Sequence, residues 1–302
     1  GLHAMKKQVT LLLALIVLHP PAMARVSAAL PDGLLIIGFD GENWYPYVSQ
    51  PLTNSWRKIA AIRNPGSVTC QSDSGRFLFK GSDGRVYEYL DGDNAPKPLQ
   101  DFDSGSFTQL RAFDYGFLMV ELVDGKSSET RLVALGNDYI RAPVLRQESA
   151  QFHPLRGNNR LYYSHVTCRL ECEPLIQEIW LKNLVTGDAR QLTLLNATSY
   201  LHSLDRSGRH GYISSNANGY YNLARLDLAT GEVVWLTNGR FTDSYPVVAD
   251  DGALYFLRRT STGTRLMRLT GSQSRSAMTS EDVEVVPLPD EIEKVRYLEI
   301  SR

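Results

Sequence analysis

Short runs of apolar, β-branched and aromatic residues recur along the chain, and a glycine precedes each of them. Examples are LLIIG after Gly33 and ALYFL after Gly252. The recurring glycines are Gly33, Gly75, Gly116, Gly157, Gly208 and Gly252, with spacings of 42, 41, 41, 51 and 44 residues. A nearly constant period of this length predicts repeated copies of one structural unit.

Each copy shows the same order of predicted elements. The glycine strand is followed by a polar turn and a second strand such as ARLDL (224–228), and several copies add a glycine turn and a further short strand. A short apolar segment such as SYLHSL (199–204) precedes the later glycines. Four short strands per unit, without helical periodicity, predict an all-β, six-bladed β-propeller of four-stranded antiparallel blades. A pair of open β-sandwiches is the alternative, which the even period disfavours.

The last residues form one further alternating strand, KVRYLEIS (294–301). Little sequence precedes Gly33 that could supply an inner strand for the first blade. We therefore predict that the C-terminal strand joins the N-terminal blade and closes the ring, which removes two sheet edges. Short helices are an alternative interpretation of residues 53–62 and 289–295, and both are too short to change the fold class. Residues 25–302 are predicted to form a single propeller domain.

The first residues have the pattern of an export signal. Lys6 and Lys7 precede the apolar run 9–18, and Ala22 to Ala24 match the A-x-A cleavage pattern. Residues 1–24 are therefore predicted to be a signal peptide. Residues 1–4 before Met5 have the pattern of a cloning remnant, with a misassigned start as the alternative. The apolar run is too short to span a bilayer as a mature helix. We expect a monomeric periplasmic chain without a membrane span.

Charge excludes two classes of partner. Removing residues 1–24 leaves 30 basic and 33 acidic residues, a formal charge of about −3. This balance provides no electrostatic attraction for nucleic acid or anionic lipid.

The three cysteines favour a disulfide over a metal site. Cys168 and Cys172 lie close together in HVTCRLECEP, and in an exported protein such a pair favours a disulfide, with two free thiols as the alternative. A zinc site would need further ligands that the neighbouring sequence lacks. Cys70 remains unpaired and is predicted to be a small buried residue. We expect no metal and no cofactor.

Two histidines occupy matching positions in the repeat. His153 in QFHPLRGNN, His202 in SYLHSLDRSG and Pro246 in SYPVVADDG align at the start of the predicted inner strands. Inner strands line the channel, so His153 and His202, with Asp205, are the candidate ligand site at the channel mouth. The alternative is a structural role in which each histidine hydrogen-bonds a neighbouring blade.

The fourth unit is longer than its neighbours, and the excess falls around VTCRLECEPLIQ (166–177). A loop closed by the predicted disulfide would present Arg169, Leu170 and Glu171 as a protein-binding element. A tolerated insertion without a binding role is the alternative.

Two segments carry a family resemblance. DRSGRHGYISSNANGYYNLARLDLATGEVVWLT (205–237) and DSYPVVADDGALYFL (243–257) resemble the blades of the TolB-like six-bladed propellers, the WD40-like PD40 repeat family. The resemblance implies a periplasmic propeller, here without the α/β domain that precedes the propeller in TolB. It identifies the fold much better than the function.

The sequence contains none of the motifs HExxH, GxxxxGK[ST], GxGxxG, DxDxDG or GxSxG. The predicted function is therefore a protein-binding or scaffold module of the cell envelope, without enzymatic activity. The alternative is a small-ligand or metal-assisted enzyme of the carbohydrate lyase or hydrolase type that uses His153 and His202.

Overall fold

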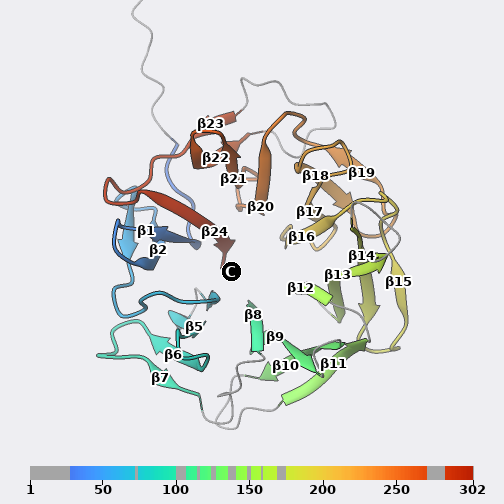
Figure 1. Ribbon diagram of the computed structural model, residues 1–302, viewed down its shortest axis with the longest axis horizontal. Helices are drawn as coiled ribbons and strands as arrows, with labels where there is room; N and C mark the ends of the chain where they lie inside the picture. Colours follow the sequence, from blue (N-terminus) through green and yellow to red (C-terminus); the bar gives the residue numbers. More distant parts are fainter. Residues whose placement is uncertain are drawn as a thin grey trace, which may run out of the picture.

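The computed structural model describes residues 28–71, 74–99, 107–113, 116–123, 127–134, 141–147, 151–157, 159–168, 175–270 and 283–301. These residues form six four-stranded antiparallel sheets, arranged around a central axis (Figure 1). The prediction of an all-β propeller with four-stranded antiparallel blades is confirmed. The predicted signal peptide lies outside the described residues.

The sheets are numbered here along the chain, and each is given from its inner to its outer strand. Sheet 1 comprises β24 (Lys294–Ile300), β1 (Leu34–Phe39), β2 (Trp44–Gln50) and β3 (Ser55–Lys58). Sheet 2 comprises β4 (Val68–Gln71), β5 (Arg76–Lys80), β6 (Val86–Leu90) and β7 (Lys97–Pro98). Sheet 3 comprises β8 (Phe107–Phe113), β9 (Gly116–Val123), β10 (Ser127–Ala134) and β11 (Arg141–Gln147). Sheet 4 comprises β12 (Gln151–Gly157), β13 (Arg160–Cys168), β14 (Ile176–Asn183) and β15 (Ala189–Gln191). Sheet 5 comprises β16 (Ser199–Leu204), β17 (His210–Ser215), β18 (Asn222–Asp227) and β19 (Val233–Trp235). Sheet 6 comprises β20 (Thr242–Val248), β21 (Leu254–Thr260), β22 (Gly263–Leu269) and β23 (Val283–Val285).

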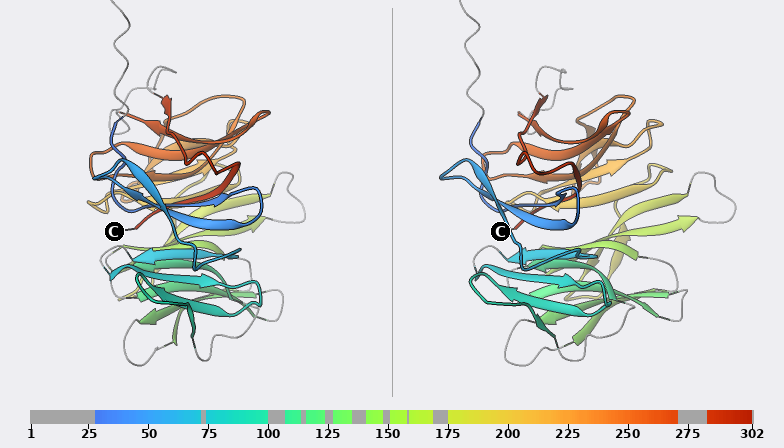
Figure 2. Two further views of the ribbon diagram at one scale, coloured as in Figure 1. Left: turned by 90° about the vertical axis from the view of Figure 1, so that its left-hand side faces the viewer. Right: turned by 60° about the vertical axis from the view of Figure 1, so that its left-hand side comes forward.

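The two ends of the described chain meet in sheet 1. β24 pairs antiparallel with β1, with Leu34 opposite Ile300, and the Ser301 amide donates a 2.8 Å hydrogen bond to the Gly33 carbonyl. Figures 1 and 2 show this red strand beside the blue first strands. KVRYLEIS therefore lies beside LLIIG, as the sequence predicted, and covers an edge of β1 that would otherwise be open.

Among the described residues, the hydrophobic core is divided into six clusters, and each cluster lies between two neighbouring sheets. Neighbouring residues on the second strand of a sheet point into different clusters, because side chains alternate across a strand. Residues that share a cluster across a sheet boundary are Ile37 with Phe77, Leu78 with Phe117, Leu118 with Tyr163, Tyr162 with Ile213, Tyr212 with Phe256, and Leu257 with Tyr47. Burial on both faces explains why these strands read as continuous apolar runs.

The structure has no helix at either of the two segments for which a helical interpretation was open. Residues 53–62 contain the edge strand β3, in which Trp56 pairs with Ser49, and Asn54 forms the preceding turn with a φ of 47°. In residues 289–295, the Ile292 amide donates to the Pro289 carbonyl in a single turn, and β24 begins at Lys294. Pairing with an open strand edge satisfies more backbone groups than one short helical turn does. No helix in the described part of the chain is long and apolar enough to cross a membrane.

Two glycines at equivalent turns provide a matched test of backbone packing. Gly187 and Gly231 have φ values of 81° and 80°, so alanine at either position is expected to cost about 1–2 kcal/mol in unfolding free energy. A Cβ at Gly231 would lie 2.4 Å from the Leu192 carbonyl oxygen, whereas a Cβ at Gly187 meets nothing within 4 Å. Gly231→Ala is therefore expected to cost about 1–3 kcal/mol more than Gly187→Ala in urea denaturation, because of this overlap. Equal losses for the two variants would contradict the prediction.

Candidate functional site

Five of the six inner strands contain a β-bulge. The extra residue is Arg296 in β24 and His202 in β16. In the other three strands two residues lie opposite one, and these pairs are Gln109–Leu110 in β8, His153–Pro154 in β12 and Tyr245–Pro246 in β20. A bulge bends its strand and turns a side chain out of the regular alternation. We call these residues the bulge ring.

A cavity of about 880 Å³ opens at the bulge ring. Bulge residues in its lining are Gln109, Leu110, His202, Tyr245 and Arg296, which come from four inner strands. Residues 81–84, the turn between β5 and β6, also line it. Gln109 and Tyr245 have φ values of 52° and 54°, a left-handed conformation that is costly for residues other than glycine. The inner strands thus hold strained residues at the wall of the cavity.

Aromatic rings form a continuous wall from sheet 5 to sheet 1. The ring centroids of His202 and Tyr245 are 4.9 Å apart, and those of Tyr245 and Tyr297 are 5.3 Å apart. Tyr200 lies 6.1 Å from His202 on the other side, and borders a second pocket of about 290 Å³. Burial raises the pKa of Tyr200 to about 12.

Arg111 links inner strands at the wall of the cavity. Its Nη2 donates a 2.6 Å hydrogen bond to the His202 carbonyl in sheet 5, and its Nε lies 3.4 Å from Glu299 Oε1 in sheet 1. The Thr69 hydroxyl donates to the same carboxylate oxygen at 2.7 Å. Glu299 is 2% exposed and its Oε2 has no hydrogen-bond partner among the described atoms. Burial raises the pKa of Glu299 to about 7.

The structure places the predicted ligand residues in three different settings. His202 lines both cavities and is 6% exposed. His153 lies at the bulge of β12, which is the register position of His202, but its side chain is outside the described part of the structure. Asp205 belongs to the turn between β16 and β17, and its side-chain hydrogen bonds lie within that turn and the strand that follows.

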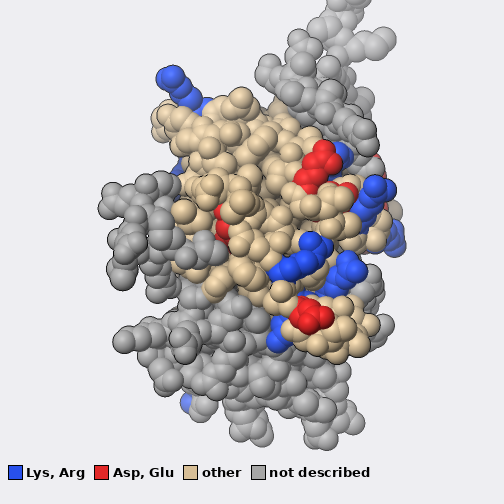
Figure 3. Space-filling model, turned by 90° about the vertical axis from the view of Figure 1, so that its right-hand side faces the viewer, with Lys and Arg blue, Asp and Glu red and all other residues tan. Residues whose placement is uncertain are grey.

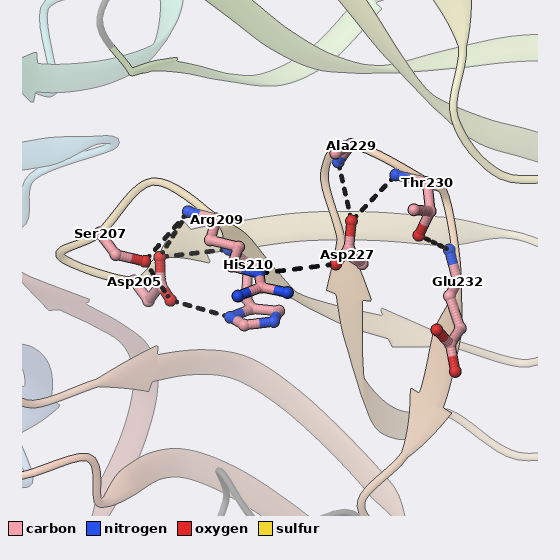
Figure 4. A network of polar contacts seen from close by, with 8 residues as sticks. All are labelled: Asp205, Ser207, Arg209, His210, Asp227, Ala229, Thr230 and Glu232. Carbon is pink, nitrogen blue, oxygen red and sulfur yellow. Dashed lines mark hydrogen bonds and ion pairs between the residues drawn. The ribbon is translucent and has the colours of Figure 1, made fainter.

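Asp205 is part of a network that holds the turns of sheet 5 (Figure 4). Its carboxylate accepts hydrogen bonds from the Ser207 hydroxyl, the Arg209 amide and the amide of His210, and lies 3.0 Å from His210 Nδ1. Burial acts to raise the pKa of Asp205, but these hydrogen bonds outweigh it and hold the pKa below its usual value. Asp227 accepts the Ala229 and Thr230 amides in the same way. Both carboxylates thus act as turn caps, which is a structural role.

Within the described residues, no three His, Cys, Asp or Glu side chains are grouped so that they could hold a metal ion. Arg169, Leu170, Glu171 and Cys172 lie outside the described part of the chain, as does the side chain of Cys168. The disulfide and the protein-binding loop therefore stay predictions.

Counting reactive thiols tests the predicted disulfide, with Cys70 as the expected free thiol. It is free and 6% exposed, as predicted, and burial raises its pKa to about 12. The thiol of Cys70 is therefore expected to resist alkylation in the folded protein. If Cys168 and Cys172 are bonded, denaturation without reductant is expected to expose a single thiol per chain, and denaturation with reductant all three. Three reactive thiols without reductant would contradict the disulfide.

The surface has no large patch of one charge on the face drawn in Figure 3. Its described basic and acidic side chains lie interspersed. This agrees with the formal charge of −1 for the whole sequence.

Comparisons with known proteins identify the fold. No protein-family model and no curated protein matches the chain. Among solved structures, a protein assigned as TolB from Agrobacterium tumefaciens superposes with a TM-score of 0.60 at 12% identity, over 85% of this chain and 88% of that one. The fold is that of the TolB-like β-propellers.

Two further solved structures share the TolB-like fold. The propeller domain of the Trilobed protease from Pyrococcus furiosus matches with a TM-score of 0.55 at 11% identity, over 80% of this chain and 81% of that one. An oligogalacturonate lyase in complex with manganese matches with a TM-score of 0.56 at 12% identity, over 82% and 74%. Identities this low establish the TolB-like fold alone, so function must be inferred from the site.

Four residues of the cavity wall and its surroundings were not predicted from the sequence: Arg111, Arg296, Tyr297 and Glu299. A signal for Arg296 was present in KVRYLEI, because the buried residues Val295 and Leu298 are three positions apart. Regular alternation would separate them by two or four, so an odd spacing marks a bulge.

Proposed function

We propose that this chain is an exported periplasmic propeller, a single domain of residues 25–302 whose six sheets close into one ring, and that it acts as a non-enzymatic binding scaffold of the cell envelope. The central cavity receives a segment of a protein partner. The loop of Arg169, Leu170 and Glu171, closed by Cys168 and Cys172, provides a second contact.

The observation that carries this proposal is the cavity of about 880 Å³ at the bulge ring. Its volume is within the range of sites that enclose a small ligand or a few residues of a peptide. Four separate inner strands supply its bulge residues, so the scaffold fixes the positions of the side chains around the cavity. The pairing of β24 with β1 and the six clusters between neighbouring sheets support the closed ring.

Blocking the cavity tests the proposal. Ser82 is an exposed residue in the β5–β6 turn that lines the cavity, and Ser261 is exposed in the corresponding β21–β22 turn of sheet 6, away from the cavity lining. Affinity capture from an envelope extract is expected to recover the same protein with the wild type and Ser261→Trp, and to lose it with Ser82→Trp. Capture that Ser82→Trp leaves unchanged would rule out the cavity as the binding site.

A second candidate function is a small-ligand or metal-assisted reaction at His153 and His202. One observation favours it: both histidines lie at bulges of inner strands in neighbouring sheets. Metal analysis of the purified protein tests it, with the double variant His153→Ala, His202→Ala as control. A stoichiometric metal ion that the double variant loses would support this candidate, and protein without metal would oppose the metal-assisted form.

A further inference from the structure

Arg296 is held in a fixed position at the cavity wall. It is the bulged residue of β24, and its guanidinium carbon lies 4.6 Å from the centroid of the Trp44 ring. Its Nη2 donates a hydrogen bond to the Pro65 carbonyl. Stacking on an aromatic ring and a bond to a backbone carbonyl restrict the side chain while leaving other donors of the guanidinium available.

The charge of Arg296 has no carboxylate counterpart in the described structure. Its guanidinium donates a hydrogen bond to a carbonyl oxygen, and none of the ion pairs among the described residues includes it. Arg111, which lines the same cavity, is paired with Glu299. Arg296 is therefore a cation of the cavity wall that has no carboxylate partner among the described residues.

The acidic residue in the cavity lining does not supply that charge. Asp83 Oδ2 accepts a 2.6 Å hydrogen bond from the Tyr87 hydroxyl, and its Oδ1 accepts from the Arg85 amide. The lining also contains Lys80, so its basic residues outnumber its acidic one. Partial burial lowers the pKa of Arg296, although the residue as a whole is exposed and can be reached by a ligand. An anion in the cavity would favour the charged form of its guanidinium.

We propose that Arg296 binds a carboxylate of the partner segment, supplied by an Asp or Glu side chain or a C-terminus, so that the cavity selects acidic peptides. This rests on the proposed function, and it assigns the chemistry of the partner. The planar guanidinium binds carboxylates with two parallel hydrogen bonds, and a preorganised one loses less side-chain freedom when it does so. The Tyr245 ring beside it closes the wall toward His202.

Peptide titration tests the inference directly. The full chain is titrated with acetyl-Gly-Asp-Gly-Glu-Gly-amide and with its neutral counterpart acetyl-Gly-Asn-Gly-Gln-Gly-amide, and binding is followed by NMR. We expect the acidic peptide to bind roughly tenfold more tightly, as a charge-assisted hydrogen-bonded pair provides. Arg296→Gln is expected to abolish this preference, whereas Arg296→Lys keeps part of it because the charge remains without the planar fork.

Arg265→Gln is the matched control, because Arg265 is an exposed arginine of β22 outside the cavity lining. It is expected to retain the full preference, and an equal loss in this variant would overturn the assignment to Arg296. Inorganic phosphate and D-glucuronate are titrated in the same way as two alternative anionic ligands. If either binds through Arg296 more tightly than the acidic peptide, the peptide assignment is wrong.

The outcomes separate this inference from the proposed function. If Ser82→Trp abolishes partner capture while Arg296→Gln preserves both capture and peptide binding, the scaffold function stands and the carboxylate site falls. If no partner is captured while the acidic preference depends on Arg296, the anion site stands and the scaffold function falls.

Discussion

A chain that ends at Glu293 is expected to lose its cooperative unfolding transition. The truncation removes β24, which supplies Val295 and Leu298 to the core between sheets 1 and 6, and it exposes the inner edge of β1. Burying two such side chains contributes about 1.5–3 kcal/mol each, and the hydrogen-bonded ladder is lost with them. Domains of this kind are stable by only about 5–15 kcal/mol. Circular dichroism during thermal unfolding, with size-exclusion chromatography, would detect the loss.

Two leucine substitutions test separately how much the buried side chains of β24 contribute to stability. Leu298 is 1% exposed, so Leu298→Ala is expected to lower the unfolding free energy by about 2–5 kcal/mol. Leu52 is 101% exposed, and Leu52→Ala is expected to change it by less than about 0.5 kcal/mol. A truncated chain that unfolds with the midpoint of the full chain would show that β24 does not stabilise the fold.

The stability of the protein is expected to fall between about pH 4.5 and pH 7 because of Glu299, and Glu299→Gln is expected to remove this component. Burial raises the folded-state pKa of Glu299 from 4.5 to about 7, so the folded protein retains a proton that the unfolded chain releases in this range. The stabilisation is complete below the unfolded pKa and is lost as the pH rises through the folded pKa. The difference corresponds to about 3 kcal/mol.

Urea denaturation across this pH range measures the effect. The wild-type unfolding free energy should decline relative to that of Glu299→Gln by about 3 kcal/mol and become parallel to it above about pH 8. NMR detection of a carboxyl group that titrates near pH 7 in the wild type, and is missing from the variant, would assign the proton. Parallel pH profiles for the two proteins would contradict the assignment.

The repeat pattern was sufficient to predict the sheets but not the structure of residues 53–62 and 289–295. Glycine turns and alternating residues mark the strands because their signals are local, as in 214–239, where β18 and β19 lie where expected. The helical interpretation of residues 53–62 stayed open in the sequence because their strand is specified by pairing with β2 across a turn at Asn54. Propensity alone does not include such pairing.

The sequence was sufficient to predict where the candidate site lies, but not which residues form it or how they contact one another. Aligning His153 and His202 identified the inner-strand position that the structure shows as a bulge. The alignment could not indicate that Arg111 reaches the His202 carbonyl or that Glu299 lies beside Arg111. These contacts join residues from different sheets, and their geometry depends on how the sheets pack.

The pairing of β24 with β1 places both ends of the described chain in one sheet, with Ser301 bonded to Gly33. The order of the sheets around the axis therefore does not depend on where the polypeptide starts. A circular permutant that links these ends and opens the chain in the exposed 261–262 turn should retain the fold, because neighbouring termini are the usual condition for successful permutation. In such a permutant β24 and β1 would form one continuous hairpin. Their pairing would then be local in the chain and would no longer require strands from its two ends to associate.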